Sequence, residues 1–123
     1  MIILKKKVQD IRGDIIFLNF NKKSVNIIEI KTGHSRGGHY HKFESEHILI
    51  SGKIEYREED IETKKELIKI FDGPLIIKTQ PKKAHLITAI NDTIFVEVFD
   101  GEYDAINYSK YRKIVDEKMK TKD

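Results

Sequence analysis

Short apolar segments separated by turn signals are the feature of this chain that most restricts its fold. They lie at residues 2–8, 14–20, 25–31, 46–51, 53–57, 66–71, 75–79, 84–90 and 93–99. Between them stand groups such as Arg12-Gly13, Ser51-Gly52 and Asn91-Asp92, which are typical of turns. One further strand is expected around His39 and His41. Strands of this length and spacing predict an all-β sandwich or barrel.

The pattern changes near the C-terminus. Over residues 104–120, Ile106, Tyr111, Ile114, Val115 and Met119 recur at helical rather than strand spacing. We therefore expect a short C-terminal helix that covers one mouth or edge of the sheet structure.

Length and composition narrow the class of protein further. The 123 residues suit a single domain over residues 1–123. Cysteine is absent, so a cytoplasmic location is the default expectation. The apolar run at residues 1–4 meets three lysines at once and is too short for a signal peptide or a membrane span. The lysines at 5–7 and at 118, 120 and 122 are typical of a solvated strand face and tail, so neither nucleic acid nor membrane is expected as a partner.

Histidines concentrate in one stretch of the chain. His39 and His41 are two residues apart and share a face if they lie on a strand. On the same reasoning Glu46 shares a face with Ile48 and Ile50, which are expected to line the interior. His85 shares a face with Ile87 and Ala89.

The set His39, His41, Glu46 and His85 therefore predicts a site for a divalent transition metal. Zinc, iron, manganese and nickel all suit these ligands, and the sequence does not choose among them. Glu44 and His47 compete as ligands, although His47 is expected outside the pocket because its strand parity is opposite to that of Glu46. His34 is expected to be exposed.

These motifs resemble those of the cupins. The spacing His39-x-His41-x4-Glu46-x5-Gly52 is similar to the first cupin motif, and residues 80–85 with Asn91 are similar to the second. In the second motif Gln80 replaces the leading proline and Lys82 stands where glycine is usual. The resemblance implies a double-stranded β-helix (jelly-roll) barrel, often a homodimer, with a metal held by the two motifs.

A narrower resemblance covers most of the chain. Residues 10–14, 36–42 and 103–108 resemble the WxcM-like dTDP-4-keto-6-deoxyhexose 3,4-ketoisomerases. In that family the paired histidines transfer protons, which implies this role for His39 and His41, and the family commonly lacks the metal-type glutamate. The run at residues 36–41 also resembles the C-terminal cupin domain of bifunctional capsular-polysaccharide epimerase/reductases, which carries the metal set.

Both relatives act on 4-keto nucleotide sugars, so the first expectation is an isomerase or epimerase of such a substrate. His39 and His41 would be bases if no metal is bound; if they are ligands, Tyr40 or Glu44 would have to act instead. Arg36 and Lys42 flank the site and are candidates for contacts to a diphosphate, with Tyr40 as a further substrate-binding residue. The alternatives are another metal-dependent cupin, such as a non-haem dioxygenase, or a non-catalytic ligand-binding barrel. A homodimer that pairs through edge strands is expected.

Overall fold

The computed structural model describes residues 1–101 and 104–120 of the chain. Tyr103, part of one family-like segment, and Lys122, part of the basic tail, lie outside the described residues. The elements are β1 (Ile2–Asp10), β2 (Gly13–Phe20), β3 (Lys23–Ile30), β4 (Ser35–Tyr40), β5 (Ser45–Ser51), β6 (Lys53–Asp60), β7 (Glu66–Asp72), β8 (Leu75–Thr79), β9 (Lys83–Ala89), β10 (Thr93–Asp100), β11 (Ile106–Asn107) and α1 (Ser109–Lys120).

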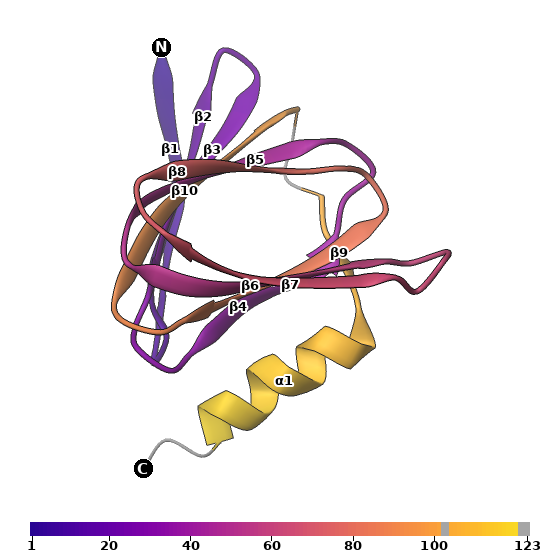
Figure 1. Ribbon diagram of the computed structural model, residues 1–123. Helices are drawn as coiled ribbons and strands as arrows, with labels where there is room; N and C mark the ends of the chain where they lie inside the picture. The colour runs from indigo at the N-terminus through magenta and orange to yellow at the C-terminus, as the bar shows by residue number, and fades with distance from the viewer. Residues whose placement is uncertain (102–103, 121–123) are drawn as a thin grey trace.

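The strands form two antiparallel sheets that face each other as an all-β jelly roll (Figure 1). One sheet has the strand order β1-β2-β3-β10-β5-β8, and the other has the order β11-β4-β9-β6-β7. The expected strands are therefore confirmed, although β6 continues to Asp60, three residues beyond the segment 53–57 that the sequence indicated. None of the helical segments in the described residues has the length and apolar character needed to cross a bilayer.

The main core lies between the two sheets. It contains Ile30, Leu49 and Phe95 from the six-stranded sheet, and Ile54 and Ile87 from the five-stranded sheet; each of these side chains is buried. Burying aliphatic and aromatic side chains of this size contributes about 1.5–3 kcal/mol each relative to leaving them exposed. The space between the sheets also has a polar part, which lies near the C-terminal end of β4 and the N-terminal end of β9 and is described below.

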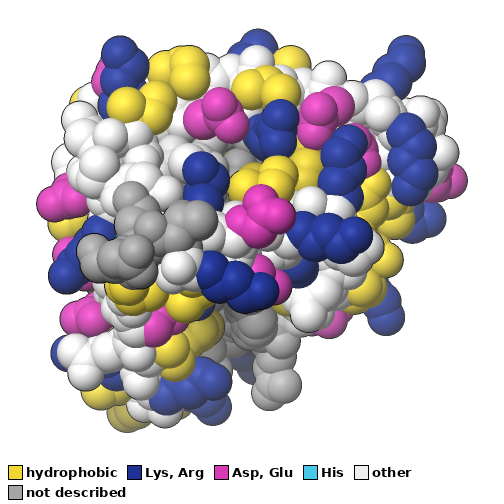
Figure 2. Space-filling view, turned by 90° about the horizontal axis from the view of Figure 1, so that it is seen from below, with side chains coloured by type: hydrophobic (Ala, Val, Ile, Leu, Met, Phe, Trp, Pro, Cys, Tyr) yellow, Lys and Arg dark blue, Asp and Glu magenta, His cyan; other side chains and the backbone are white. Residues whose placement is uncertain are grey.

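The C-terminal helix is confirmed, but it begins later than expected and lies elsewhere. Ile106 and Asn107 pair with Tyr40 and His39 as β11, and the helix starts only at Ser109. The backbone of residues 106–107 is held in the β4 ladder, which prevents helix formation there. The helix packs on the outer face of the five-stranded sheet, where Tyr111 and Val115 contact residues of β9 (Figure 1). From below, the side on which α1 lies, basic and acidic side chains are mixed over the surface (Figure 2).

Candidate metal centre

Four side chains from β4, β9 and β10 and from the residue that follows β4 converge between the sheets. His39 lies on β4, His41 follows the end of β4, His85 lies on β9 and Glu97 lies on β10. One potential ligand atom from each of these residues lies within 4.8 Å of the others. The structure thus brings the three sequence-predicted histidines together, with a carboxylate that the sequence analysis did not predict.

Two glycines allow β4 to present His39 at this place. Gly37 and Gly38 have positive φ angles of 100° and 74°, and the pairing of β4 with β9 shifts register between Gly37 and His39. A Cβ atom on Gly37 would lie 2.8 Å from the backbone oxygen of His85, so a side chain there would push the two strands apart. His39 consequently pairs directly with His85 across the ladder.

The structure corrects the prediction for Glu46. Glu46 lies on the outer face of β5 beside Ile48, and it pairs with Lys78 of β8. His47, expected outside, is instead buried and points inward. The parity argument assigned Ile48 and Ile50 of β5, together with Glu46, to the interior. Ile48 and Ile50 in fact lie on the outer face, and Ile50 is 48% exposed.

The carboxylate at the site belongs to the strand next to β5. Glu97 of β10 is the direct cross-strand partner of His47, and it is 4% exposed. In the sequence, Glu97 stands out as the one acidic residue in residues 94–99, where the other five residues are apolar. A charged residue at a buried strand position needs polar or charged partners. The position of Glu97 among apolar residues could therefore have indicated a functional role for it.

Two further side chains hold Glu97. The Nε2 atom of His47 lies 3.0 Å from Oε2 of Glu97, and the Nδ2 group of Asn26 donates to Oε1 at 3.3 Å. His41 also reaches the carboxylate, with its Nε2 atom 3.7 Å from Oε2. Asn26 pairs with Glu97 across β3 and β10, so this arrangement follows directly from the strand register.

Burial and the carboxylate set the charges of the cluster. Burial favours the charge-free form of Glu97, but its interactions with His41 and His47 outweigh this and hold the pKa of Glu97 well below its usual value. Burial lowers the pKa of His39 to about 4 and the pKa of His85 well below its usual value. Two imidazoles are therefore neutral at pH 7 beside an ionised carboxylate.

His41 differs from the other histidines. Burial alone would lower its pKa, but the interactions with Glu97 and with the backbone oxygen of Asp104 outweigh burial and raise it. A carbonyl oxygen can only accept, so Nδ1 of His41 donates to Asp104. The Nε2 atom is thereby directed toward Glu97. The ring is stacked on Phe43, with 5.0 Å between ring centroids, which limits its rotation.

This donor set fits a divalent transition metal. Neutral imidazoles and one carboxylate are the ligands that manganese, iron, nickel and zinc accept in proteins. Within the described residues, the buried Nδ1 atom of His85 has no hydrogen-bond partner. A buried polar atom without a partner is costly in a folded protein, and a metal ligand role would explain its retention. His39, His41, His85 and Glu97 are the residues that would hold the ion.

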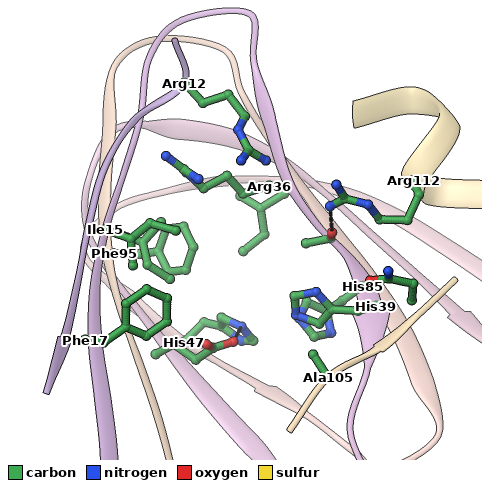
Figure 3. A pocket seen from close by; sticks show the side chains of 15 residues that line it. Arg12, Ile15, Phe17, Arg36, His39, His47, His85, Phe95, Ala105 and Arg112 are labelled. Atoms are coloured by element: carbon green, nitrogen blue, oxygen red, sulfur yellow. Dashed lines mark hydrogen bonds and ion pairs between the residues drawn. The ribbon is translucent and has the colours of Figure 1, made fainter. Parts of the chain in front are cut away.

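A cavity of about 360 Å³ opens beside the cluster (Figure 3). Its wall includes His39, His47, His85 and Glu97, while Ile15, Phe17, Ile28 and Phe95 form an apolar side. Arg12, Arg36 and Arg112 line the cavity on another side, as Figure 3 shows. A small polar molecule bound in this space would contact the cluster and the arginines together.

The arginines are held by backbone and carboxylate groups. Arg36, only 4% exposed, donates to the backbone oxygens of Glu29 and Gly13 at 3.0 and 2.8 Å. Arg12 makes two hydrogen bonds to Asp10, at 3.2 and 2.7 Å. Burial and the neighbouring charge of Arg12 lower the pKa of Arg36 to about 10, so it stays charged at pH 7.

Arg112 reaches the same wall from α1. It donates to the backbone oxygen of Gly37 at 2.9 Å. Sequence analysis gave it no role, because only the packing of the helix against β4 brings it near the cavity.

The chain is similar to solved structures, although no similarity to a known sequence family is found. No family model matches the chain, and no curated protein matches it. Among solved structures, oxalate decarboxylase from Lactobacillus farciminis in a formate complex has a TM-score of 0.75 at 20% identity over 86% of this chain. CapF from Staphylococcus aureus, a capsular polysaccharide assembling protein, has a TM-score of 0.69 at 16% identity over 85% of the chain. The chain has a cupin fold.

Another similar structure is the oxalate decarboxylase of Bacillus subtilis, for which Mn(II) centres are described. Its TM-score is 0.75 at 14% identity over 87% of this chain. The present chain matches only 30–34% of the length of these proteins. At such low identities the similarity establishes the fold alone.

The remaining sequence-predicted residues of this chain lie outside the cavity wall. Lys42 is exposed. Tyr40 packs against Tyr108 with 6.5 Å between ring centroids, on the helix side of β4. Glu44 accepts a hydrogen bond from Gln80 at 2.9 Å on the surface. His34, expected to be exposed, is buried. Of the three residues predicted to bind substrate, only Arg36 lines the cavity.

Proposed function

We propose that this cupin is a metal-dependent isomerase or epimerase that acts on a 4-keto nucleotide sugar. The observation that carries the proposal is the cluster of His39, His41, His85 and Glu97, because three of its members (His39, His85 and Glu97) line a cavity whose wall also contains Arg36. The proposal keeps the reaction class expected from the sequence and replaces Glu46 by Glu97 in the ligand set.

A divalent ion bound by the cluster would supply an electrophile for a substrate carbonyl oxygen and for the negative charge that forms on it. The chain's own residues would orient the substrate. Arg12, Arg36 and Arg112 supply a positively charged wall, and Asp10 is the carboxylate that contacts both Arg12 and Arg36. An anionic group such as a phosphate would reduce the repulsion between these guanidinium groups.

Proton transfer next to the carbonyl needs a base within reach of the substrate. The close approach of His39, His41 and His85 supports a ligand role for these histidines when metal is present. Tyr40 and Glu44, which the sequence offered as bases if the histidines bind metal, do not line the cavity. Among the described residues, His47 is the histidine in the cavity wall that lies outside the metal-ligand set, but its contact with Glu97 supports a positioning role.

Two observations support a nucleotide sugar as the substrate, one from the sequence and one from the fold. The sequence resembles 4-keto-sugar isomerases and epimerases at residues 36–42, and the fold resembles CapF, whose name refers to capsular polysaccharide assembly. Arginines beside the site are compatible with a diphosphate. Polysaccharide precursor synthesis is the setting that these supports favour.

A second candidate is a metal-dependent reaction of a small carboxylate. It is favoured by the TM-score of 0.75 to oxalate decarboxylases and by the arginines, which also suit a carboxylate. A dioxygenase reaction or ligand binding without catalysis are the further alternatives for the same site.

The deciding experiment incubates the metal-loaded protein with 4-keto nucleotide sugars in deuterated water and follows the substrate by NMR. An isomerase or epimerase incorporates deuterium next to the ketone, and the Glu97→Gln variant loses this activity while Glu46→Gln retains it. Parallel assays measure carbon dioxide release from oxalate and oxygen consumption. Turnover in one of these assays without deuterium incorporation would replace the proposal by the corresponding alternative. A metal-loaded protein that shifts its melting temperature with ligand but has no activity would indicate a binding protein.

A further inference from the structure

A second cavity, also of about 360 Å³, lies over the inner face of β1, β2 and β3, which are neighbours at one end of the six-stranded sheet (Figure 1). The cavity beside the metal cluster is called the first cavity from here on. The polar and aromatic side chains in the wall of the second cavity are Lys5, Lys6, Phe17, Asn19, Ser24 and Asn26. The proposed function does not use this cavity.

One cross-strand row joins the second cavity to the candidate metal centre. Lys6 pairs with Phe17, and Phe17 pairs with Asn26. Asn26 in turn pairs with Glu97. Because adjacent strands are about 4.8 Å apart, the backbone of Lys6 lies about 14 Å from that of Glu97. Phe17 lines both cavities, so they adjoin at its ring.

A β-bulge in β1 brings two consecutive lysines to the second cavity. The register of β1 against β2 shifts between Leu4 and Lys6, which leaves Lys5 as the extra residue. In a regular strand adjacent side chains point to opposite faces, so only one of the two lysines could reach the inner face. Bulges often redirect a side chain at a functional site. Lys7, the next residue, lies outside the cavity wall.

The charges of these two lysines are not neutralised within the described part of the chain. Neither Lys5 nor Lys6 forms an ion pair there, whereas the Nζ atom of Lys7 lies 3.6 Å from a carboxylate oxygen of Asp14. The Nζ atom of Lys6 instead lies 5.1 Å from the centroid of the Phe17 ring, in the cavity wall. Two cations in one cavity repel each other, and an anion bound between them would remove this repulsion.

The other polar groups of the cavity restrict the class of anion. The hydroxyl of Ser24 donates to the backbone oxygen of Gly101 at 2.7 Å, so its proton is already used. The amide of Asn19 adds N–H donors to the two ammonium groups. A phosphate group carries up to two negative charges and three acceptor oxygens, which match two cations and an amide better than a carboxylate does. The ring of Phe17 offers an apolar surface beside it.

We propose that the second cavity binds the phosphate group of a small molecule, with Lys5 and Lys6 as its cationic contacts and the amide of Asn19 as a further donor. The phosphate belongs either to the far end of a substrate that extends past Phe17 from the first cavity or to a separate ligand. The proposal concerns binding and holds for any reaction at the metal centre.

Asn26 couples this site to the metal centre. It is 1% exposed, it lines the second cavity, and its Nδ2 group donates to Oε1 of Glu97 at 3.3 Å. A ligand that contacts Asn26 therefore acts on the carboxylate that the metal would bind. Phosphate binding should change the metal affinity, and metal should change the phosphate affinity by the same factor.

The test titrates phenyl phosphate into the protein and two variants by isothermal titration calorimetry. The double variant Lys5→Gln/Lys6→Gln removes both cations, and its dissociation constant should be at least about 10-fold higher than that of wild type. The control Lys7→Gln removes a charge from the next residue of β1, outside the cavity wall, and should change the dissociation constant by less than about twofold. Circular dichroism reports whether each variant is folded.

Nuclear magnetic resonance locates the bound phosphate. Chemical-shift changes should be largest at the amides of Lys6, Phe17 and Asn19, and small at Gly37 and Arg112, which line the first cavity only. The affinity for Zn²⁺ with and without saturating phenyl phosphate measures the coupling. It should change at least about fivefold in wild type and remain constant in the double variant.

The nucleotide sugar UDP-glucose distinguishes the two sources of the phosphate. Competition with phenyl phosphate, together with shift changes in both cavities, would assign the site to the far end of a substrate. Simultaneous binding, with UDP-glucose confined to the first cavity, would assign it to a separate ligand. Both results support the phosphate site, and neither requires turnover, so a failure of the proposed reaction is distinguishable from a failure of this proposal.

Three results would overturn the proposal. The first is the absence of shift changes at the second cavity up to about 10 mM phenyl phosphate, where even a weak site would be occupied. The second is binding confined to the first cavity. The third is a loss of affinity in Lys7→Gln equal to that in the double variant, which would indicate a general effect of net charge.

Discussion

Glu97 on β10 and His47 on β5 are direct cross-strand partners, and 3.0 Å separates Oε2 of the carboxylate from Nε2 of the imidazole. The pair places the carboxylate of the candidate metal centre on β10. Glu46, the residue that the first cupin motif indicates, lies one position before His47 and therefore on the other face of the sheet.

The first prediction separates these two glutamates. Glu97→Gln removes the negative charge beside His39, His41 and His85, so the affinity for Mn²⁺ or Zn²⁺ should fall by more than about 100-fold. Glu46→Gln should leave the affinity unchanged, because Glu46 lies on the outer face. Isothermal titration calorimetry and metal analysis by mass spectrometry would measure both. Loss of metal in Glu46→Gln alone would show that the ligand assignment is wrong.

The second prediction concerns the residues that hold Glu97. His47→Ala and Asn26→Ala each remove a hydrogen bond to the carboxylate and should lower metal affinity about 10–100-fold. His47→Gln can still donate a hydrogen bond and should recover part of the loss. The electron paramagnetic resonance spectrum of bound Mn²⁺ should broaden in the alanine variants, which a purely structural effect on folding would not cause. Unaltered affinity and spectra in His47→Ala would exclude a positioning role.

The third prediction is the pH dependence of stability in the metal-free protein. Burial lowers the pKa of His39 to about 4, so the unfolded chain binds a proton near pH 6.5 that the folded protein does not bind. Stability from this group is therefore complete above pH 6.5 and is lost as the pH falls. Between pH 6.5 and pH 5, His39 alone should cost about 2 kcal/mol of unfolding free energy.

The other groups with shifted pKa values either change the free energy of unfolding little between pH 6.5 and pH 5 or lower it further. His85, whose pKa is also lowered, adds to the loss. His41, whose pKa is raised, stabilises the fold fully below pH 6.5 and loses this effect only as the pH rises through its folded pKa. Glu97, whose pKa is lowered, matters only below about pH 4.5. Urea unfolding with a chelator at pH 6.5 and pH 5 would test this, and His39→Asn should show a smaller difference than wild type.

The fourth prediction concerns the approach of β4 to β9. Gly37→Ala places a methyl group 2.8 Å from the backbone oxygen of His85 at a positive φ of 100°, so it should destabilise the fold by about 1–3 kcal/mol and weaken metal binding. Gly101→Ala is the matched control, since Gly101 has a φ of 88° but no atom within 4 Å of its added Cβ. It shares the backbone strain but not the contact. Chemical unfolding and calorimetric titration of both variants would show whether only Gly37→Ala affects the metal site.

Sequence patterns were sufficient for the fold and for part of the site. Alternating apolar residues and turn signals predicted the strands, and the spacing of His39 and His41 with the later His85 predicted histidines that the structure brings together. These inferences succeed because strand periodicity and turn chemistry are local properties of the chain. The start of the helix was predicted too early, because the pairing of Ile106 with Tyr40 is not local.

The sequence by itself determined the strands, the turn at Ser51-Gly52 and the grouping of His39, His41 and His85 in one site. The tertiary structure decided which carboxylate joins them. Parity on β5 was ambiguous because this strand has apolar residues on both faces: Ile48 and Ile50 lie on the outer face, and Leu49 lies on the inner face beside His47. Only the register of β3, β10 and β5 brings Asn26, Glu97 and His47 into one row, since their pairing joins positions that are far apart in the chain. Such long-range pairing leaves no periodic signal in the sequence. The tertiary structure alone therefore identifies Glu97 as the carboxylate of the site.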